Sequence, residues 1–180
     1  MRTHAVVGLA LAAFTVACGL GVVGGADFDP SADFTRYATF TWDEPDDRPI
    51  GDPRLENNPF FDERLHAAIA IELAEVGIRA GEADGGLVVH HHATVRNRFD
   101  IYDVDERAGY RRPAGYTEGA QVVQYDEGTI LVDIADSETR AVIWRGWARF
   151  DIGRALANPD LMDRAIQEAI GRMFEDFPGR

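Results

Sequence analysis

Two segments late in the chain, 129–135 and 141–152, constrain its fold most strongly because both alternate between apolar and polar residues. A period of two residues is typical of half-buried β-strands, and the polar stretch 136–140 predicts the turn of a hairpin. The register with Asp136 opposite Arg140 gives three pairs on one face: Ile134 with Val142, Val132 with Trp144, and Ile130 with Gly146. A shift by one residue would break this match, so the pattern indicates an antiparallel hairpin with one buried face.

The same alternation predicts two further strands. Residues 37–42 form one of them, with Ala38, Phe40 and Trp42 on its apolar face. Residues 87–99 form a longer strand, with Leu87, Val89, His91, Ala93, Val95 and Phe99 on one face. His90 and His92 lie on its other face. In the predicted hairpin, Asp133 lies diagonal to Arg145, close enough for an ion pair.

Two helices are predicted by matching start signals. Asn58 and Asn158 can each cap a helix, and a proline follows each of them at the position that suits the first helical residue. Apolar residues then recur at helical spacing: Phe61, Leu65, Ile69, Leu73 and Val76 in the first helix, and Met162, Ala165, Ile166, Ala169, Ile170, Met173 and Phe177 in the second. Gly77 predicts the end of the first helix, and Pro178 with Gly179 predicts the end of the second.

The predicted order is strand, helix, two or three strands, helix. Hairpin-connected strands form an antiparallel sheet, and amphipathic helices bury their apolar stripes against such a sheet. We therefore expect an α+β domain in which an antiparallel β-sheet has two α-helices packed on one face. The proline-rich stretch 43–58 is predicted to be a solvated surface loop with solubilising acids.

The beginning of the chain has the layout of a signal peptide. Arg2 precedes an uncharged apolar run, 5–17, and the only cysteine of the chain, Cys18, follows it. The small residue Ala17 before Cys18 resembles the lipobox of bacterial lipoproteins, in which the cysteine becomes the lipidated first residue. We expect a signal peptide at 1–17, a lipidated Cys18 with a short tether over 18–26, and a single domain over 27–180.

Two other arrangements fit the same leader. Residues 24–26 could precede an ordinary signal-peptidase cut, and 5–23 is an uncharged stretch long enough for an uncleaved membrane anchor. All three arrangements export the domain. Gly19 after Cys18 resembles the sorting signal of enteric bacterial lipoproteins that favours the outer membrane, so we expect attachment at its periplasmic face.

The charge of the chain excludes a protein built around phosphate contacts. Its 180 residues include 31 acids and 18 basic residues, all of them arginine, with a formal net charge of −13. A nucleic-acid-binding surface needs a positive face, so we expect no nucleic-acid partner. A single cysteine excludes an intramolecular disulfide and any Cys-x-x-Cys metal site. Anionic lipid headgroups repel an acidic surface, so we expect the anchor rather than the domain surface to hold the protein at the membrane.

The histidine run 90–92 is the most conspicuous candidate for chemistry. On a strand, His90 and His92 share a face while His91 points into the core, so at most two of them could bind one metal ion. A zinc site needs three or four ligands, which makes His90 and His92 weak metal candidates unless a neighbouring strand completes the site. A metal-binding protein or metal-assisted hydrolase is thus the alternative function. Neither serine lies in a Gly-x-Ser-x-Gly elbow, and we expect neither an enzyme nor a cofactor.

The segment 100–124 is the place where we expect a partner to bind, because loops of this length are uncommon and are often functional. It interleaves aromatic and arginine side chains, of which the binding candidates are Tyr102, Tyr110, Arg111, Arg112 and Tyr116. Trp147 joins these candidates because the predicted register places it on the face opposite Trp144, beside Arg145 and Arg149.

Several short blocks follow one another in a distinctive order: 29–34, 37–42, 83–84, 127–134 and 144–148, all after the lipobox-like Cys18. In that order they resemble the domain-of-unknown-function 4136 family of bacterial envelope lipoproteins, over roughly 27–177. The resemblance implies export, lipid attachment and a sheet with two helices, and it implies no activity. We therefore expect an envelope lipoprotein that acts as a noncatalytic binding or structural module. Its lipid attaches it to the membrane, and its expected partner is a protein or glycan of the envelope.

Overall fold

The computed structural model describes residues 21–43, 50–56, 58–81, 86–102 and 121–180. The strands are β1 (Val23–Phe28), β2 (Thr39–Trp42), β3 (Arg79–Ala80), β4 (Leu87–Tyr102), β5 (Gln121–Asp136) and β6 (Val142–Asp151). The helices are α1 (Pro59–Glu75), α3 (Gly153–Leu156) and α4 (Pro159–Phe174), with a 3-10 turn η1 at Phe34–Arg36. α3 is too short to produce a periodic pattern and was not predicted.

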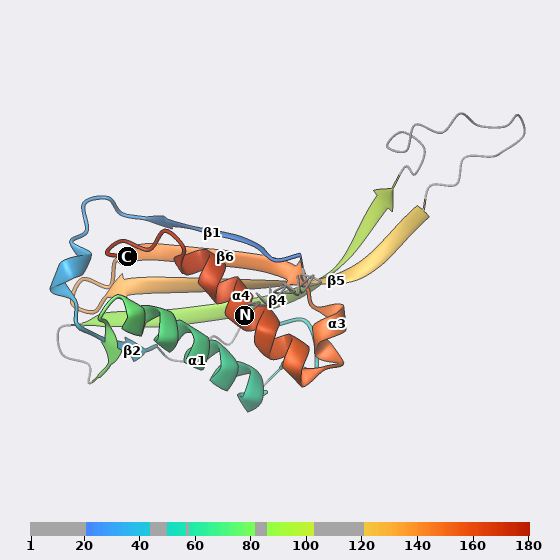
Figure 1. Ribbon diagram of the computed structural model, residues 1–180, viewed down its shortest axis with the longest axis horizontal. Helices are drawn as coiled ribbons and strands as arrows, with labels where there is room; N and C mark the ends of the chain where they lie inside the picture. The colour runs from blue at the N-terminus through green and yellow to red at the C-terminus, as the bar shows by residue number, and fades with distance from the viewer. Residues whose placement is uncertain (1–20, 44–49, 57, 82–85, 103–120) are drawn as a thin grey trace, which may run out of the picture.

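The six strands form one sheet in the order β1-β6-β5-β4-β2-β3. β1, β6, β5 and β4 pair antiparallel, which confirms the predicted α+β class. α1 and α4 lie side by side on one face of the sheet (Figure 1). β2 instead runs parallel to β3 and β4. The reason is that α1 carries the chain back to the end of the sheet where β2 begins, so the next strands run in the same direction as β2. The sheet is therefore mostly antiparallel, as predicted, and only the pairs made by β2 are parallel.

The β5–β6 hairpin exists, but its predicted register is wrong by two residues. Ile134 pairs with Trp144, Val132 with Gly146, and Ile130 with Ala148. The turn closes between Asp136 and Ala141, and a bulge beside Ala135 adds a further residue. Because the shift is even, the apolar face stays buried. Val142, which was predicted on that face, is 49% exposed, and Ile143 is buried in its place.

Both predicted helix starts are confirmed. The Asn58 side chain accepts hydrogen bonds from the N–H groups of Phe60 and Phe61, and Asn158 does the same at the start of α4. Gly77 follows α1 with a φ of 87°, in the left-handed region that favours glycine at a helix end. α4 ends at Phe174, earlier than predicted, although Phe177 beyond it is still buried. The predicted apolar stripes pack against the sheet.

β1 was not predicted as a strand. The sequence assigns 18–26 to a tether, but Val23 pairs with Arg149 and Phe28 with Trp144 along the edge of the sheet. Gly24 is packed closely here, since a Cβ atom at this position would lie 3.0 Å from the Trp147 carbonyl oxygen. The folded domain therefore begins at Val23.

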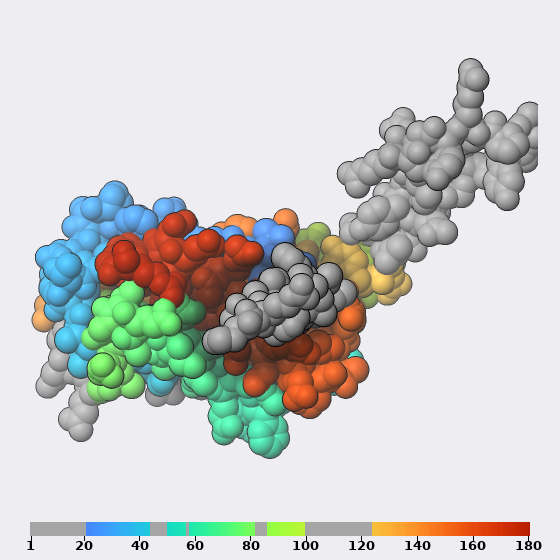
Figure 2. Space-filling model, in the orientation of Figure 1, coloured from blue at the N-terminus to red at the C-terminus, as the bar shows by residue number. Residues whose placement is uncertain are grey.

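β4 and β5 are both longer than predicted. β6 ends at Asp151, opposite Glu127, whereas β4 and β5 continue together as a two-stranded arm, defined here as residues 97–102 and 121–126. The arm projects from the body of the domain, and no helix covers it (Figures 1 and 2). Phe99 was predicted to face the core, yet it is 62% exposed because it lies beyond the helices.

The predicted loop over 43–58 is only partly a solvated loop. In its described part, Leu55 is buried in the core, and the Val95 N–H donates to the Ile50 carbonyl oxygen over 2.7 Å. Asp52 is also buried, and its carboxylate accepts hydrogen bonds from the Arg54 guanidinium. Its role is therefore structural rather than solubilising.

Candidate functional site

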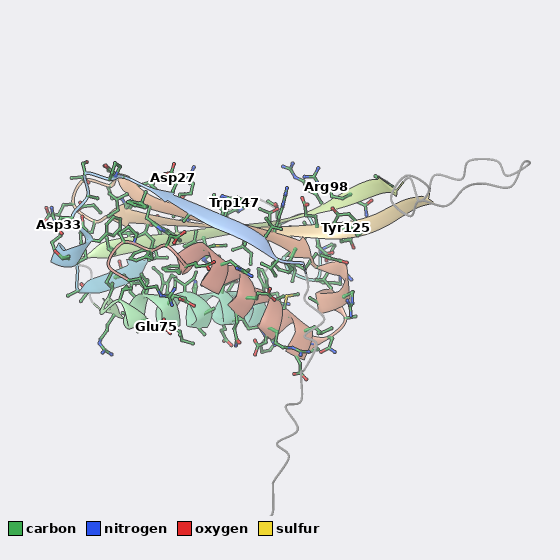
Figure 3. All side chains as sticks on the ribbon, turned by 45° about the horizontal axis from the view of Figure 1, so that its top comes forward. Asp27, Asp33, Glu75, Arg98, Tyr125 and Trp147 are labelled. Atoms are coloured by element: carbon green, nitrogen blue, oxygen red, sulfur yellow. The ribbon has the colours of Figure 1, made fainter. Side chains whose placement is uncertain are left out.

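The face of the sheet away from α1 and α4 is uncovered in the described part of the chain and forms the candidate binding surface (Figure 3). We call it the open face. Because side chains alternate along a strand, its members follow from the register. They are His90, His92, Thr94, Arg96 and Arg98 of β4, Tyr125, Glu127, Thr129, Leu131 and Asp133 of β5, and Arg145, Trp147 and Arg149 of β6.

Trp147 lies near the middle of the open face. It is opposite Leu131 on β5 and Gly25 on β1, and it is 39% exposed, whereas Trp144 is buried on the helix side. Gly25 leaves the indole uncovered on the β1 side, where even a Cβ atom would come within 3.7 Å of the ring. The structure thus places Trp147 on the face that the alternation predicts. A large exposed aromatic plane of this kind suits stacking against a partner.

An ion pair lies beside Trp147. Arg145 and Asp133 are directly opposite each other rather than diagonal as predicted, and the guanidinium donates to both carboxylate oxygens over 2.5 and 2.7 Å. Hydrogen bonding to Asp133 raises the pKa of Arg145 above its ordinary value. Such a bidentate pair fixes the orientation of both side chains, so this part of the open face is preorganised.

Two arginines of the open face have no charged partner among the described residues, Arg96 and Arg149. Arg149 borders a hollow of about 450 Å³ at the base of the arm, together with Arg98, Tyr125 and Glu127. Glu127 is 9% exposed and accepts hydrogen bonds from Arg98 over 2.9 Å. The open face therefore presents arginine side chains on a chain whose net charge is strongly negative.

The three neighbouring histidines are divided between the two faces. His90 and His92 lie on the open face, and no group of three or more histidine, cysteine or acidic side chains within the described residues is arranged to hold a metal ion. His91 points toward α1, where its ring meets His66 edge-on at 5.0 Å. The structure therefore brings no third ligand to His90 and His92 within the described part of the chain.

His91 belongs to a polar cluster under α1 that was not predicted. The His66 ring stacks on Trp42 with 3.9 Å between ring centres, and His91 Nε2 lies 3.5 Å from an Asp62 oxygen. Burial lowers the pKa of His91 and the charge of His66 lowers it further, whereas Asp62 acts in the opposite direction. Burial also lowers the pKa of His66. Both rings are therefore held neutral between the helix and the sheet.

A second unpredicted polar cluster surrounds Asp136, at the end of the sheet away from the arm. Asp136 is buried and accepts a 2.6 Å hydrogen bond from the Tyr37 hydroxyl, as well as two backbone N–H bonds from the β5–β6 turn. The Tyr37 bond is the main cause that lowers the pKa of Asp136 to about 2, and burial raises the pKa of Tyr37 to about 12. A buried carboxylate cannot be identified from its neighbours in sequence, so the strand pattern gave no signal for it.

Several predicted binding residues lie outside the described part of the chain. They are Cys18, Tyr110, Arg111, Arg112 and Tyr116. Tyr102 belongs to β4, but its side chain is not described. Among the described residues, the helices are too short or too polar to cross a membrane.

Comparisons with solved structures extend to the fold alone. A PDZ domain protein from Parabacteroides distasonis is 16% identical with a TM-score of 0.50, and the match covers 88% of this chain and 37% of that one. This chain therefore spans about a third of that protein. A minor lipoprotein from Acinetobacter baumannii matches at 10% identity and a TM-score of 0.44, covering 77% of this chain and 91% of its own. A neuraminyllactose-binding hemagglutinin homolog from Helicobacter pylori matches at 10% identity and a TM-score of 0.46, and the match covers 79% of this chain and 86% of that one.

The family relationship is much clearer than these structural likenesses. No curated protein matches the chain. A family model does match it, over residues 25–179, and this range includes every strand and helix from β2 to α4. The match confirms the resemblance that the order of short blocks indicates. The chain belongs to the family described as Domain of unknown function (DUF4136).

Proposed function

We propose that this protein is a lipoprotein of the bacterial cell envelope that is exported by the signal peptide 1–17 and anchored through Cys18 at the periplasmic face of the outer membrane. Its domain acts as a noncatalytic binding module for a protein or glycan of the envelope. The leader sequence and the position of the only cysteine support the anchor. The open face supports binding.

β1 favours a cut before Cys18 over the two alternatives. A signal-peptidase cut after Ala26 would remove the first four residues of β1 and leave the edge of β6 unpaired. An uncleaved anchor helix over 5–23 would take Val23 out of its pairing with Arg149. A cut before Cys18 leaves the whole strand intact. The pairing of β1 therefore supports the lipoprotein arrangement.

The observation that carries the binding proposal is the exposed Trp147 between the fixed Arg145–Asp133 pair and Arg149, which has no charged partner among the described residues. Aromatic and arginine side chains dominate the energetics of many interfaces. A sheet face that served only to cover the core would not need an exposed tryptophan beside the Arg149 guanidinium. This arrangement suits an envelope protein or glycan that offers an apolar surface and an anionic group.

Metabolic labelling with a fatty acid tests the anchor. We expect the full-length wild-type protein to carry the label and to fractionate with the outer membrane. A Cys18→Ser variant should carry no label, because the only thiol is lost. Label on the variant, or none on the wild type, would contradict anchoring through Cys18.

Affinity capture from envelope extracts and from isolated cell-wall polymer tests the open face. Trp147→Ala should lose most of the material captured by the wild type. Phe60→Ala is the matched control, because Phe60 is a large side chain on the helix side that is 66% exposed. Equal capture by the wild type and the Trp147 variant would refute a binding role for this face.

A further inference from the structure

We propose that the end of the domain that carries the arm docks on the phospholipid surface that holds the chain's own lipid anchor. The proposal depends on the lipid attachment at Cys18 proposed above. It adds an orientation and a second membrane contact, formed by Phe99 of the arm and by Arg149 at its base. It thereby departs from the expectation that the anchor alone holds the domain at the membrane.

The direction of β1 places the anchor and the arm at the same end of the molecule. Val23 begins β1 and pairs with Arg149, two residues before β6 ends at the base of the arm. From Val23 the strand runs away from the arm toward Phe28, opposite Trp144 (Figure 1). The chain that precedes Val23 therefore reaches the domain at the arm end.

The backbone from Cys18 to Val23 and the arm have similar lengths. The backbone from Cys18 to Val23 can span at most about 18 Å, whatever its conformation, since each residue adds no more than about 3.6 Å. The arm extends six residues beyond the last pair of β6, which at about 3.3 Å per residue is about 20 Å. A bilayer surface that holds Cys18 thus lies within reach of the arm.

The side chains at this end suit a lipid interface. Phe99 is 62% exposed on one face of the arm, and the hollow at its base is lined by Arg149, which lacks a described partner, and by Arg98. A phenylalanine ring inserts at the boundary between headgroups and acyl chains, and guanidinium groups bind phosphate strongly. Glu127 and Asp151 also line this hollow, and Glu127 pairs with Arg98, so Arg149 is the guanidinium that we assign to the phosphate. Asp27 and Asp33 lie toward the opposite end of the sheet (Figure 3).

A fluorophore attached to a single new cysteine tests the contact in the full lipidated chain. Cys18 is the only native cysteine and its thiol is consumed by the lipid, so Phe99→Cys can be labelled selectively with a polarity-sensitive dye. Val142→Cys is the matched control, because Val142 is 49% exposed at the far end of β6. Both proteins are reconstituted in phosphatidylcholine vesicles containing phosphatidylglycerol, with and without a spin-labelled lipid as quencher.

We expect both proteins to float with the vesicles. The emission of the dye at residue 99 should shift to shorter wavelength, and the spin-labelled lipid should quench most of it. The dye at residue 142 should keep its emission. Replacing Arg149 by glutamine should weaken quenching at residue 99, whereas Arg164→Gln on α4 should leave it unchanged. Flotation with equal, weak quenching at both sites would overturn the docked orientation but not the anchor. Failure to float would overturn both proposals.

Discussion

At the scale of single residues, two polar clusters bind parts of the domain that lie far apart in the sequence. Tyr37 and Asp136 join the segment before β2 to the β5–β6 turn, and His66 and His91 join α1 to β4. Each cluster holds its groups in one protonation state, because burial and hydrogen bonds displace their pKa values. Stability should therefore depend on pH at both clusters, with opposite signs.

The histidine cluster should make the domain less stable in acid. The pKa of His91 lies below its ordinary value of 6.5, so its contribution is fully present above pH 6.5. That contribution is lost as the pH falls below 6.5, because the unfolded chain takes up a proton that the folded chain resists. We expect the free energy of unfolding, measured by urea titration, to fall less between pH 7 and 5 in His91→Gln than in the wild type.

Thr94→Ala on the open face is the control, because it changes no titratable group and should keep the wild-type slope. The prediction fails if His91→Gln loses as much stability as the wild type over this pH range.

The tyrosine cluster should make the domain less stable in alkali. The pKa of Tyr37 is raised from 10 to about 12, so its contribution is present below pH 10 and is lost as the pH rises from 10 toward 12. Tyr37→Phe should be less stable than the wild type at pH 7, because Asp136 loses a 2.6 Å hydrogen bond. It should also lose less stability than the wild type between pH 9 and 11.

Denaturant titrations at these pH values provide the measurement, and Tyr125→Phe on the open face is the control. Parallel losses of stability in the wild type and Tyr37→Phe would show that the hydroxyl does not titrate as the structure implies.

At the scale of elements, the parts that local patterns control were predicted and the parts that depend on distant pairing were not. Asn58 and Asn158 cap their helices as expected, because a cap bonds only to residues two and three positions away. β1 was missed because its residues, glycine-rich and largely exposed, carry no alternation of their own. The hairpin register was missed because the turn is one residue longer than predicted and a bulge adds one more, and the two together leave the apolar face unchanged.

In the candidate site, too, the features set by local alternation were predicted and those set by pairing between strands were not. The face occupied by Trp147 follows from alternation alone, whereas the Asp133–Arg145 alignment needed the true register. The surroundings of Arg149 could not be predicted, because they depend on which groups three neighbouring strands bring together.

The packing of β6 against α4 gives a sharp test at this scale. A Cβ atom on Gly146 would lie 2.3 Å from the Trp144 ring and 2.9 Å from the Met173 Cβ atom, so Gly146→Ala must displace the helix or the ring. We expect thermal or urea unfolding to show a loss of about 1–3 kcal/mol, the usual cost of overpacking a core.

Gly25→Ala is the matched control, because its new Cβ atom would lie at an ordinary contact distance of 3.7 Å from Trp147. If both alanine variants were equally stable, the tight contact between β6 and α4 would be refuted.

At the scale of the whole molecule, the domain has two unlike faces and two unlike ends. Helices cover one face of the sheet, while the other presents Trp147 and a row of arginines on a chain with a net charge of −13. The arm and the start of β1 share one end, where Phe99 is exposed, and the β5–β6 turn lies at the other. In the proposed orientation, Arg149 at the arm end meets the phospholipid, while Trp147 and the Arg145–Asp133 pair stay accessible on the rest of the open face.

The proposed anchoring and membrane docking require that the protein be exported and that Cys18 carry a lipid. The most direct measurement is the intact mass of the native protein purified from its membrane fraction, with fragmentation of its first residues. We predict a chain that begins at a lipid-modified Cys18 and lacks 1–17. A chain that retains Met1 with an unmodified Cys18, or one that begins at Asp27, would contradict the proposed anchoring.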